Sequence, residues 1–192
     1  MLKKLLQTEN DTATMVLRVV LGVVFFPHGM QKLTTMFGGY GFAGTMGWIT
    51  GTLHVSVLFA VLAIMAEGAG WLGLVSGLLT RVAAFGITVN MAVAVYMLHW
   101  QNGFFMNWFG AMTSAGKPAG EGFEYHLLVI AIGIALMIRG GGKWSLDRAI
   151  AEKVKWPREA RAGLEGLPDG DPFCCRENHR LPKSGKGSRL RE

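Results

Sequence analysis

The sequence predicts an all-α integral membrane protein, a four-helix bundle followed by a cytoplasmic amphipathic helix and a disordered tail. Its 192 residues are 51% hydrophobic and only 17% charged, whereas soluble domains are nearer one quarter charged. The apolar residues are also gathered into blocks that approach the roughly 20 residues needed to cross a bilayer. This pattern divides the chain into an N-terminal segment, a membrane domain, a basic amphipathic helix and a tail, at 1–12, 13–140, 141–156 and 157–192.

The four predicted spans are Ala13–Leu33, Leu53–Leu79, Val82–Leu98 and Phe123–Ile138. In the fourth block the uninterrupted apolar stretch begins only at Leu127. The first block follows Lys3 and Lys4, as the apolar core of a secretory signal would. However, Arg18 interrupts it, and Pro27-His28-Gly29 stands where a cleavage site needs small residues, so we expect a retained span.

Basic residues near the span ends predict the orientation. With four spans, one side of the membrane carries Lys3, Lys4, Arg81, Arg139, Lys143 and Arg148. The other side carries only Lys32 and Lys117. We therefore expect a multi-pass protein of the bacterial inner membrane with both termini in the cytoplasm. Apposition to the lipid bilayer accounts for the net charge of +6 without a nucleic-acid partner.

The connections between the spans differ in length and composition. The short turn at Thr80-Arg81 requires the second and third spans to be antiparallel neighbours. The other two connections are rich in glycine and aromatic residues, at Phe37–Phe42 and Trp100–Phe105. Tryptophan favours the membrane interface, and Trp108 lies in the second of these connections. We therefore expect the loops to lie on the headgroups. A lid over the mouth of the bundle is the alternative.

Glu67 is the only charged residue in the apolar run from Leu53 to Leu79. A carboxyl group at this depth is costly, and such groups usually face a polar interior where they have a function. His28 lies at a similar distance from the inner membrane edge, beside Pro27, which tends to kink a helix. We therefore expect a Glu67–His28 pair able to hold or pass a proton, with a structural hydrogen bond as the alternative.

Further polar residues are expected at the outer half of the bundle. The predicted catalytic residues are His28, Glu67, Lys32 and Glu124, and the predicted cofactor-binding residues are Tyr96 and His99. Because Glu124 and His126 are two positions apart, only one can face the interior, and we expect it to be Glu124. Lys32 and Glu124 could instead extend to the surface. His28 and His99 lack the ligand spacing of a metal site, so no metal ligands are predicted.

The sequence changes character after Ile138. Ser145 is placed to cap a short helix with Leu146 and Ile150 on one face, which is typical of a basic amphipathic helix at a membrane surface. Beyond Pro157, proline, glycine and charged residues predict disorder. The adjacent Cys174 and Cys175 are expected to stay reduced in the cytoplasm.

Several motifs occur together along the chain: Leu17-Arg18 with Phe26–Leu33, the Glu67 segment ending in Gly77–Ala84, Asn102–Phe105, Glu124-Tyr125 and Gly142–Arg148. Over about Thr14 to Ile150 they resemble the DoxX family of four-span bacterial membrane proteins. The resemblance implies an inner-membrane oxidoreductase or quinol-oxidase-like subunit linked to sulfur-compound or quinone chemistry and oxidative stress. A family name does not establish catalysis, so enzyme activity stays open.

The leading hypothesis is a redox-complex subunit that exchanges electrons or protons with quinone. The sequence contains no flavin, haem or iron–sulfur motif, so the electrons would come from a partner subunit or from the substrate. One alternative is a non-enzymatic membrane scaffold for redox partners, and another is a small proton-coupled transporter. Association into a homo-oligomer is compatible with each of the three hypotheses.

Overall fold

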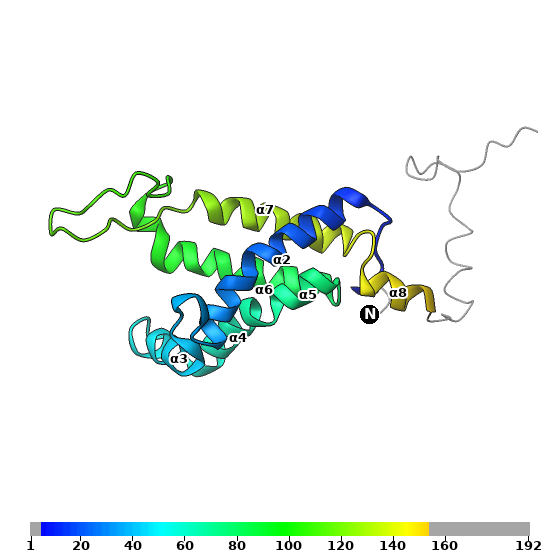
Figure 1. The fold of residues 1–192 in the computed structure, drawn as a ribbon, viewed down its shortest axis with the longest axis horizontal. Coiled ribbons are helices and arrows are strands. Elements are labelled where there is room, and N and C mark those ends of the chain that lie inside the picture. The colour runs from blue at the N-terminus through cyan, green and yellow to red at the C-terminus, as the bar shows by residue number, and fades with distance from the viewer. Residues whose placement is uncertain (1–4, 154–192) are drawn as a thin grey trace, which may run out of the picture. The chain divides into compact units, whose positions relative to one another are not determined.

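The computed structural model describes residues 5–153, and the predicted tail with Cys174 and Cys175 lies outside the described residues. Within that range the fold is all-helical, with no strand beyond one isolated bridge between Met112 and Pro118. The α-helices in Figure 1 are α2 Thr12–Leu33, α3 Gly41–Gly51, α4 Val57–Gly68, α5 Gly70–Ser76, α6 Thr80–Ala94, α7 Glu124–Arg139 and α8 Leu146–Lys153. The all-α prediction is confirmed.

Three helical segments are long and apolar enough to cross a membrane: Thr12–Leu33, Val57–Ser76 and Thr80–Asn102. They correspond to the first three predicted spans. The fourth candidate, α7, has 16 residues, which extend about 24 Å along a helix axis against a hydrocarbon core of about 30 Å. The fourth span therefore stays a prediction. Helix α7 packs against α6 and α2.

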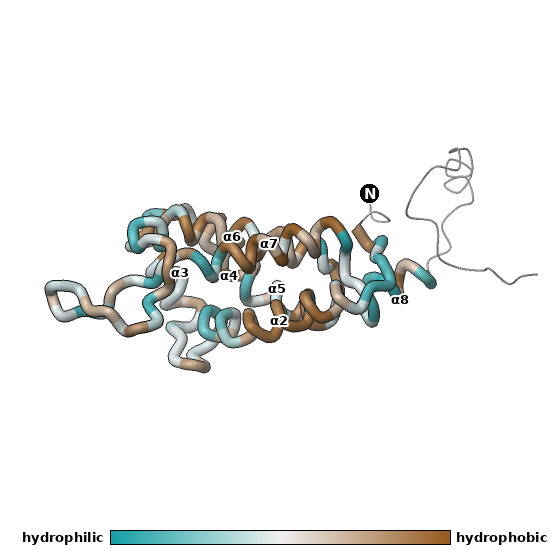
Figure 2. The backbone as a smooth tube through the Cα atoms, turned by 90° about the horizontal axis from the view of Figure 1, so that it is seen from above, coloured by the Kyte–Doolittle hydropathy of each residue, from teal (hydrophilic) through white to brown (hydrophobic). Residues whose placement is uncertain are grey.

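The main hydrophobic core is shared by α2, α5, α6 and α7, through Leu21, Phe25, Leu74, Ala84, Ile87, Met91, Val129 and Leu136. Figure 2 shows apolar positions along α2 and α7 and hydrophilic positions around α8. Many apolar side chains on the outer faces of these helices are exposed, among them Val20, Leu62 and Phe85. Such faces are expected where lipid rather than water surrounds the protein.

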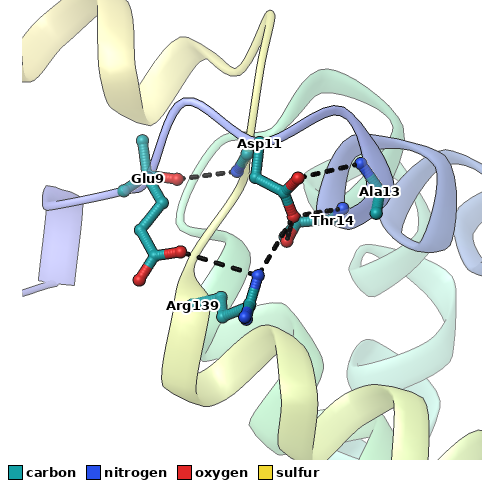
Figure 3. Close-up of polar contacts among 7 residues, drawn as sticks. Glu9, Asp11, Ala13, Thr14 and Arg139 are labelled. Carbon is teal, nitrogen blue, oxygen red and sulfur yellow. Dashed lines mark hydrogen bonds and ion pairs between the residues drawn. The ribbon is translucent and has the colours of Figure 1, made fainter. Parts of the chain in front are cut away.

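The residues just before α2 form a polar cap, shown in Figure 3. The Asp11 carboxylate accepts hydrogen bonds from the backbone of Ala13 and Thr14 and from the Thr14 hydroxyl, at 3.2, 2.9 and 2.5 Å. Arg139, at the end of α7, lies 3.2 Å from Asp11 and 3.6 Å from Glu9. The bonds from Thr14, followed by the bond from Ala13 and then the Arg139 charge, lower the Asp11 pKa to about 2. This cap joins the start of α2 to the end of α7.

Arg18 lies one turn further into α2 and is 1% exposed. Its guanidinium donates to the carbonyl oxygens of Leu74 and Val75 at the end of α5, at 2.5 and 2.9 Å. It also donates to those of Gly141 and Trp144 after α7, at 2.7 and 3.3 Å. Arg18 therefore does not extend to the membrane surface, because backbone acceptors from two segments surround its guanidinium. We call this arrangement the Arg18 clamp.

The turn between α5 and α6 is held from α8. Gly77 adopts a left-handed conformation with φ 70°, which glycine accepts without steric cost. Asp147 then accepts hydrogen bonds from the backbone amides of Leu79 and Thr80, at 2.7 and 2.8 Å. These amides at the start of α6 have no partner within the helix, so Asp147 caps α6 from a distant part of the chain. The expected antiparallel packing of the second and third spans is confirmed by contacts between α5 and α6.

Small residues mark the face of α5 that packs on α6. A Cβ atom added at Gly70 would lie 3.2 Å from Ile87, and one added at Gly73 would lie 3.1 Å from Ala83. Both neighbours belong to α6, so these glycines form a helix-packing face, which their spacing in the sequence indicates. Glycine here allows the two backbones to approach closely.

Helix α3 was not predicted, because its segment is rich in glycine, which has a low helix propensity. Its buried residues are Gly41, Thr45 and Ile49. Their spacing of four is that of one helix face, and it is the signal that the sequence analysis missed. Ile49 packs with Ala60 and Ile64 of α4 in a second, smaller core.

Helix α8 begins after Ser145, as predicted. The Ser145 hydroxyl accepts a hydrogen bond from the Arg148 amide at 3.3 Å, which is the geometry of an N-cap. Leu146 and Ile150 are exposed, whereas Asp147 is buried. The placement of this helix on a membrane surface stays a prediction. We refer to the end of the molecule where α2 begins, α7 ends and α8 lies as the α8 end (Figure 1).

Candidate functional site

Glu67 lies near the end of α4 and is 3% exposed. Its Oε2 atom forms an ion pair with the Lys32 ammonium group of α2. Its Oε1 atom accepts a hydrogen bond from the Asn90 side-chain amide of α6, at 2.5 Å. Three separate helices thus contribute one polar side chain each, and both carboxylate oxygens have a partner. We call these residues the Glu67 cluster.

Close packing between α2 and α4 brings the cluster together. A Cβ atom added at Gly29 would lie 2.6 Å from the Glu67 carbonyl oxygen, so only glycine permits this separation of the two helices. Lys32 follows Gly29 by three positions and therefore lies on a neighbouring part of the same helix surface. The backbone contact at Gly29 places the Lys32 side chain within reach of the carboxylate.

The expected partnership of Glu67 with His28 does not occur among the described residues. The hydrogen-bond partners of Glu67 there are Lys32 and Asn90. His28 is exposed, and its ring lies 6.0 Å from that of Phe25. Helix α2 also runs through Pro27 from Thr12 to Leu33. The choice between His28 and Lys32 depends on which side chain reaches the carboxylate, and helical spacing cannot distinguish two residues four positions apart.

Lys32 gives the cluster a connection to the surface. Its side chain is 27% exposed, whereas that of Glu67 is 4% exposed. The proposal that Lys32 simply extends outward is incorrect, because its ammonium group pairs with a buried carboxylate. The pair therefore joins a carboxylate, which can accept a proton, to an ammonium group, which can donate one.

The start of α7 differs from the expectation. His126 is 7% exposed, and its ring centroid lies 4.1 Å from that of His99. Glu124, which we expected to face inward, accepts instead from the Met106 amide and from the Trp108 indole, at 3.2 and 2.7 Å. The side chain that enters the interior is therefore His126, and Glu124 binds the loop between α6 and α7. The catalytic role predicted for Glu124 stays a prediction.

A π-helical segment, Val95–His99, extends α6 and carries both predicted cofactor-binding residues. His99 is placed beside His126, with its Nδ1 atom 2.8 Å from the Glu121 carbonyl oxygen. Tyr96, by contrast, is 85% exposed and is not brought to the Glu67 cluster. Single π-helical turns often occur at functional sites, and this one places His99 in a histidine pair.

Several buried polar atoms have no hydrogen-bond partner in the described part of the chain, including Trp71 Nε1, Thr88 Oγ1, Tyr125 Oη and His126 Nδ1. Buried polar groups without partners are uncommon and call for an explanation. The phenol hydroxyl and imidazole nitrogen are suitable partners for a quinone oxygen, so these side chains fit the cofactor that the family resemblance implies.

Asn90 and His126 are the residues that sequence reasoning did not assign to the site. Asn90 is the one amide inside the apolar third block, and a buried amide needs partners. That signal was present in the sequence. For His126 no such signal existed, because its neighbours in Glu124-Tyr125-His126 are equally polar. Among residues 5–153, no group of three or more His, Cys, Asp or Glu side chains could hold a metal ion.

Comparison with known proteins agrees with the sequence resemblance. The DoxX family model matches residues 13–100. An uncharacterized membrane protein of Mycobacterium tuberculosis is 27% identical over 79% of this chain and 89% of its own length. An uncharacterized protein of Haemophilus influenzae is 29% identical over 71% of this chain and 90% of its own length. No solved structure matches the chain.

Proposed function

We propose that this DoxX-family membrane protein is a redox-complex subunit in which the Glu67 cluster holds and transfers a proton during quinone-linked chemistry. The observation that carries the proposal is the ion pair that Lys32 forms with Glu67, whose carboxylate is buried among apolar helices. An ionisable pair inside a membrane is costly and is usually retained for a function. A scaffold that bound its partners only at the membrane surface would not need it.

Each member of the cluster has a distinct part in the proposal. Glu67 holds the proton, and the Asn90 amide, at 2.5 Å, orients the carboxylate. Lys32, which is partly exposed, exchanges protons with the surroundings. A bound quinone would supply a carbonyl oxygen that takes up protons together with electrons. Tyr125 and His126 would hold that oxygen, and the electrons would come from a partner subunit or a sulfur compound.

The finer topology also belongs to the proposal. We propose four spans, with α7 as the fourth, in the bacterial inner membrane, and both termini in the cytoplasm. The excess of basic residues at the α8 end supports this orientation. Single cysteines at Ser114, in the loop between α6 and α7, and at Glu152, in α8, would be labelled from outside the cell. Both replacements are made in a chain whose native cysteines are serines. Labelling is expected only at 114, and labelling only at 152 would reverse the orientation.

Purification of the full chain in mild detergent, followed by lipid extraction, tests the proposed cofactor. Quinone should be recovered with the protein, and a Tyr125→Phe/His126→Phe double variant should recover less. Quinone recovery equal to that of an unrelated membrane protein would remove the support for this function and leave the scaffold hypothesis ahead. Substrate uptake by proteoliposomes of the protein alone would favour a proton-coupled transporter instead.

The Glu67→Gln substitution tests the proton-linked role while keeping the shape of the side chain. We expect quinone-linked turnover of the assembled complex to fall by about 100-fold or more, the usual contribution of a proton-transferring group. Complex assembly should be retained. Glu9→Gln is the matched control, because Glu9 is exposed at the α8 end. Retained turnover in Glu67→Gln would refute the role of the carboxylate.

A further inference from the structure

Two adjoining cavities lie between the segment before α2 and helix α8. The larger, of about 380 Å³, is lined by Asn10, Lys143, Trp144, Arg148 and Glu152 among others. The smaller, of about 260 Å³, adds Gln7 and Thr8 and shares Asn10, Arg148 and Glu152 with the first. The shared residues place Arg148 between the two. We call the larger cavity the Arg148 pocket.

The charges lining the Arg148 pocket favour an anion. Lys143 and Arg148 contribute two positive charges, and Glu152 contributes the single negative charge. Glu152 accepts from the Nε atom of Arg148 at 2.7 Å, which orients the guanidinium and leaves its two terminal nitrogens as additional donors. The planar guanidinium is well suited to phosphate oxygens, and Asn10 adds a neutral donor beside it.

The walls of the pocket are fixed to the rest of the protein. The Lys143 amide donates to the Asp11 carbonyl oxygen at 3.0 Å, and the Gly142 amide donates to the Thr8 hydroxyl at 2.6 Å. The Trp144 carbonyl oxygen accepts from Arg18, and Asp147 ties α8 to the start of α6. Because these contacts hold both sides of the pocket, little ordering is required when a ligand binds.

The surroundings of the pocket indicate a lipid as the source of the anion. The residues that line the pocket lie before α2 and in or just before α8. They belong to the α8 end, where α2 begins and α7 ends (Figure 1). Trp144 is 78% exposed, with the Lys143 ammonium group 5.3 Å from its ring centroid. Leu146 and Ile150 on α8 are also exposed. Exposed tryptophan and apolar side chains beside basic ones are typical of protein surfaces at the headgroup level of a bilayer.

We propose that the Arg148 pocket binds the phosphate of an anionic phospholipid headgroup, with Lys143 and Arg148 contacting the phosphate oxygens. Trp144 and the exposed face of α8 lie against the adjoining acyl chains. A lipid bound there contacts α8 and the segment before α2 together, and so stabilises the α8 end of the protein. The site does not depend on the quinone-linked role of the Glu67 cluster.

The test uses the full chain, purified and delipidated in mild detergent, with bound lipid counted by native mass spectrometry. Wild-type protein should retain dioleoyl phosphatidylglycerol in preference to dioleoyl phosphatidylcholine. In the Lys143→Gln/Arg148→Gln variant, the ratio of retained phosphatidylglycerol to retained phosphatidylcholine should fall by about 10- to 30-fold, as expected for the loss of two basic contacts. The charge-matched control Lys117→Gln/Lys153→Gln removes two exposed lysines outside the pocket and should behave as wild type.

Three outcomes would overturn the proposal. Equal retention of the two lipids by wild type would exclude a headgroup site, and equal losses in both double variants would indicate only general surface charge. Displacement of phosphatidylglycerol by millimolar inorganic phosphate would identify a site for a soluble anion instead.

Glu152→Gln gives an independent readout, because it removes the one acidic lining residue and should increase phosphatidylglycerol retention severalfold. Because Glu152 is exposed, this variant should fold as wild type does. Unchanged or reduced phosphatidylglycerol retention in Glu152→Gln would also contradict the proposal.

Discussion

Arg18 and Glu67 are both buried charges in apolar helices, yet their surroundings differ in kind. The Arg18 guanidinium is bound by four backbone carbonyl oxygens from two segments of the chain. The Glu67 carboxylate is bound by two side chains, Lys32 and Asn90. Backbone carbonyls cannot titrate and move only when the fold moves, whereas an ammonium group can give up a proton and rotate away.

This difference in hydrogen-bond partners indicates a structural role for Arg18 and a functional role for Glu67. The Arg18 clamp satisfies carbonyl groups left open at the end of α5 and in the loop after α7, so its function is structural. The Glu67 cluster contains two groups that can exchange a proton, the Glu67 carboxylate and the Lys32 ammonium group. The fold does not require that exchange. The partners of a buried charge, rather than its burial, therefore distinguish a structural site from a candidate functional one.

Removing the Arg18 clamp should have the largest effect on stability. Arg18→Met leaves four carbonyl groups without their donor, and we expect a loss of about 3–5 kcal/mol in the free energy of unfolding. Arg18→Lys should lose less, because one ammonium group keeps the charge and some of the bonds. Thermal unfolding in detergent, followed by circular dichroism, measures both. An unchanged melting temperature in Arg18→Met would contradict the structural role of the Arg18 clamp, and with it the contrast drawn with the Glu67 cluster.

The close approach at Gly29 should be the next most sensitive point. Gly29→Ala places a Cβ atom 2.6 Å from the Glu67 carbonyl oxygen and 2.7 Å from Trp71. We expect a cost of about 1–3 kcal/mol, as for other overpacked sites, together with weakening of the Lys32–Glu67 pair. Gly47→Ala in α3 is the matched control, since nothing lies within 4 Å of its added Cβ. Equal melting temperatures of the two variants would contradict this account.

The Asp147 cap should contribute less than either. Asp147→Asn keeps one acceptor oxygen but loses the charge that serves the Leu79 and Thr80 amides. We expect a loss of about 1–2 kcal/mol, within the range for helix caps. Proteolysis at the α5–α6 turn, followed by mass spectrometry, should become faster. If cleavage there were as slow as in wild type, α8 would not be holding the turn.

The smallest effect is expected at Asp11 and should depend on pH. Its pKa in the folded protein is about 2, below the usual 3.8, so the ionised form is favoured by folding. The stabilisation is complete above pH 3.8 and is lost as pH falls through about 2. Asp11→Asn removes it at all pH values. The difference in melting temperature between wild type and variant should therefore shrink from pH 5 to pH 2, and a constant difference would argue against the cap.

The fold was predictable where hydropathy and spacing determine it. The first three spans, the Gly70 and Gly73 packing face and the Ser145 cap all follow from local patterns. Helix α3 was missed because glycine content obscured its spacing of four. The Arg18 clamp could not be predicted, because its acceptors are backbone carbonyls more than fifty positions away along the chain.

The candidate site was predicted in part. Glu67 and Lys32 were identified as polar residues at membrane depth, because a charge in an apolar run is visible in the sequence. Their pairing was not identified, since His28 shares the same helix face. The choice of His126 over Glu124 depends on how the loop between α6 and α7 folds back onto Glu124, which no local pattern indicates. Tertiary contacts decided each of these cases.

The central claim is that the Glu67 carboxyl group changes its protonation during function. Infrared difference spectroscopy of the purified protein, recorded on addition of a short-chain quinone, tests it most directly. We predict a change in a carboxyl C=O stretching band that is retained in Glu9→Gln and absent in Glu67→Gln. No such band in wild type, or the same band in Glu67→Gln, would contradict the claim and leave the Glu67 cluster a structural pair like the Arg18 clamp.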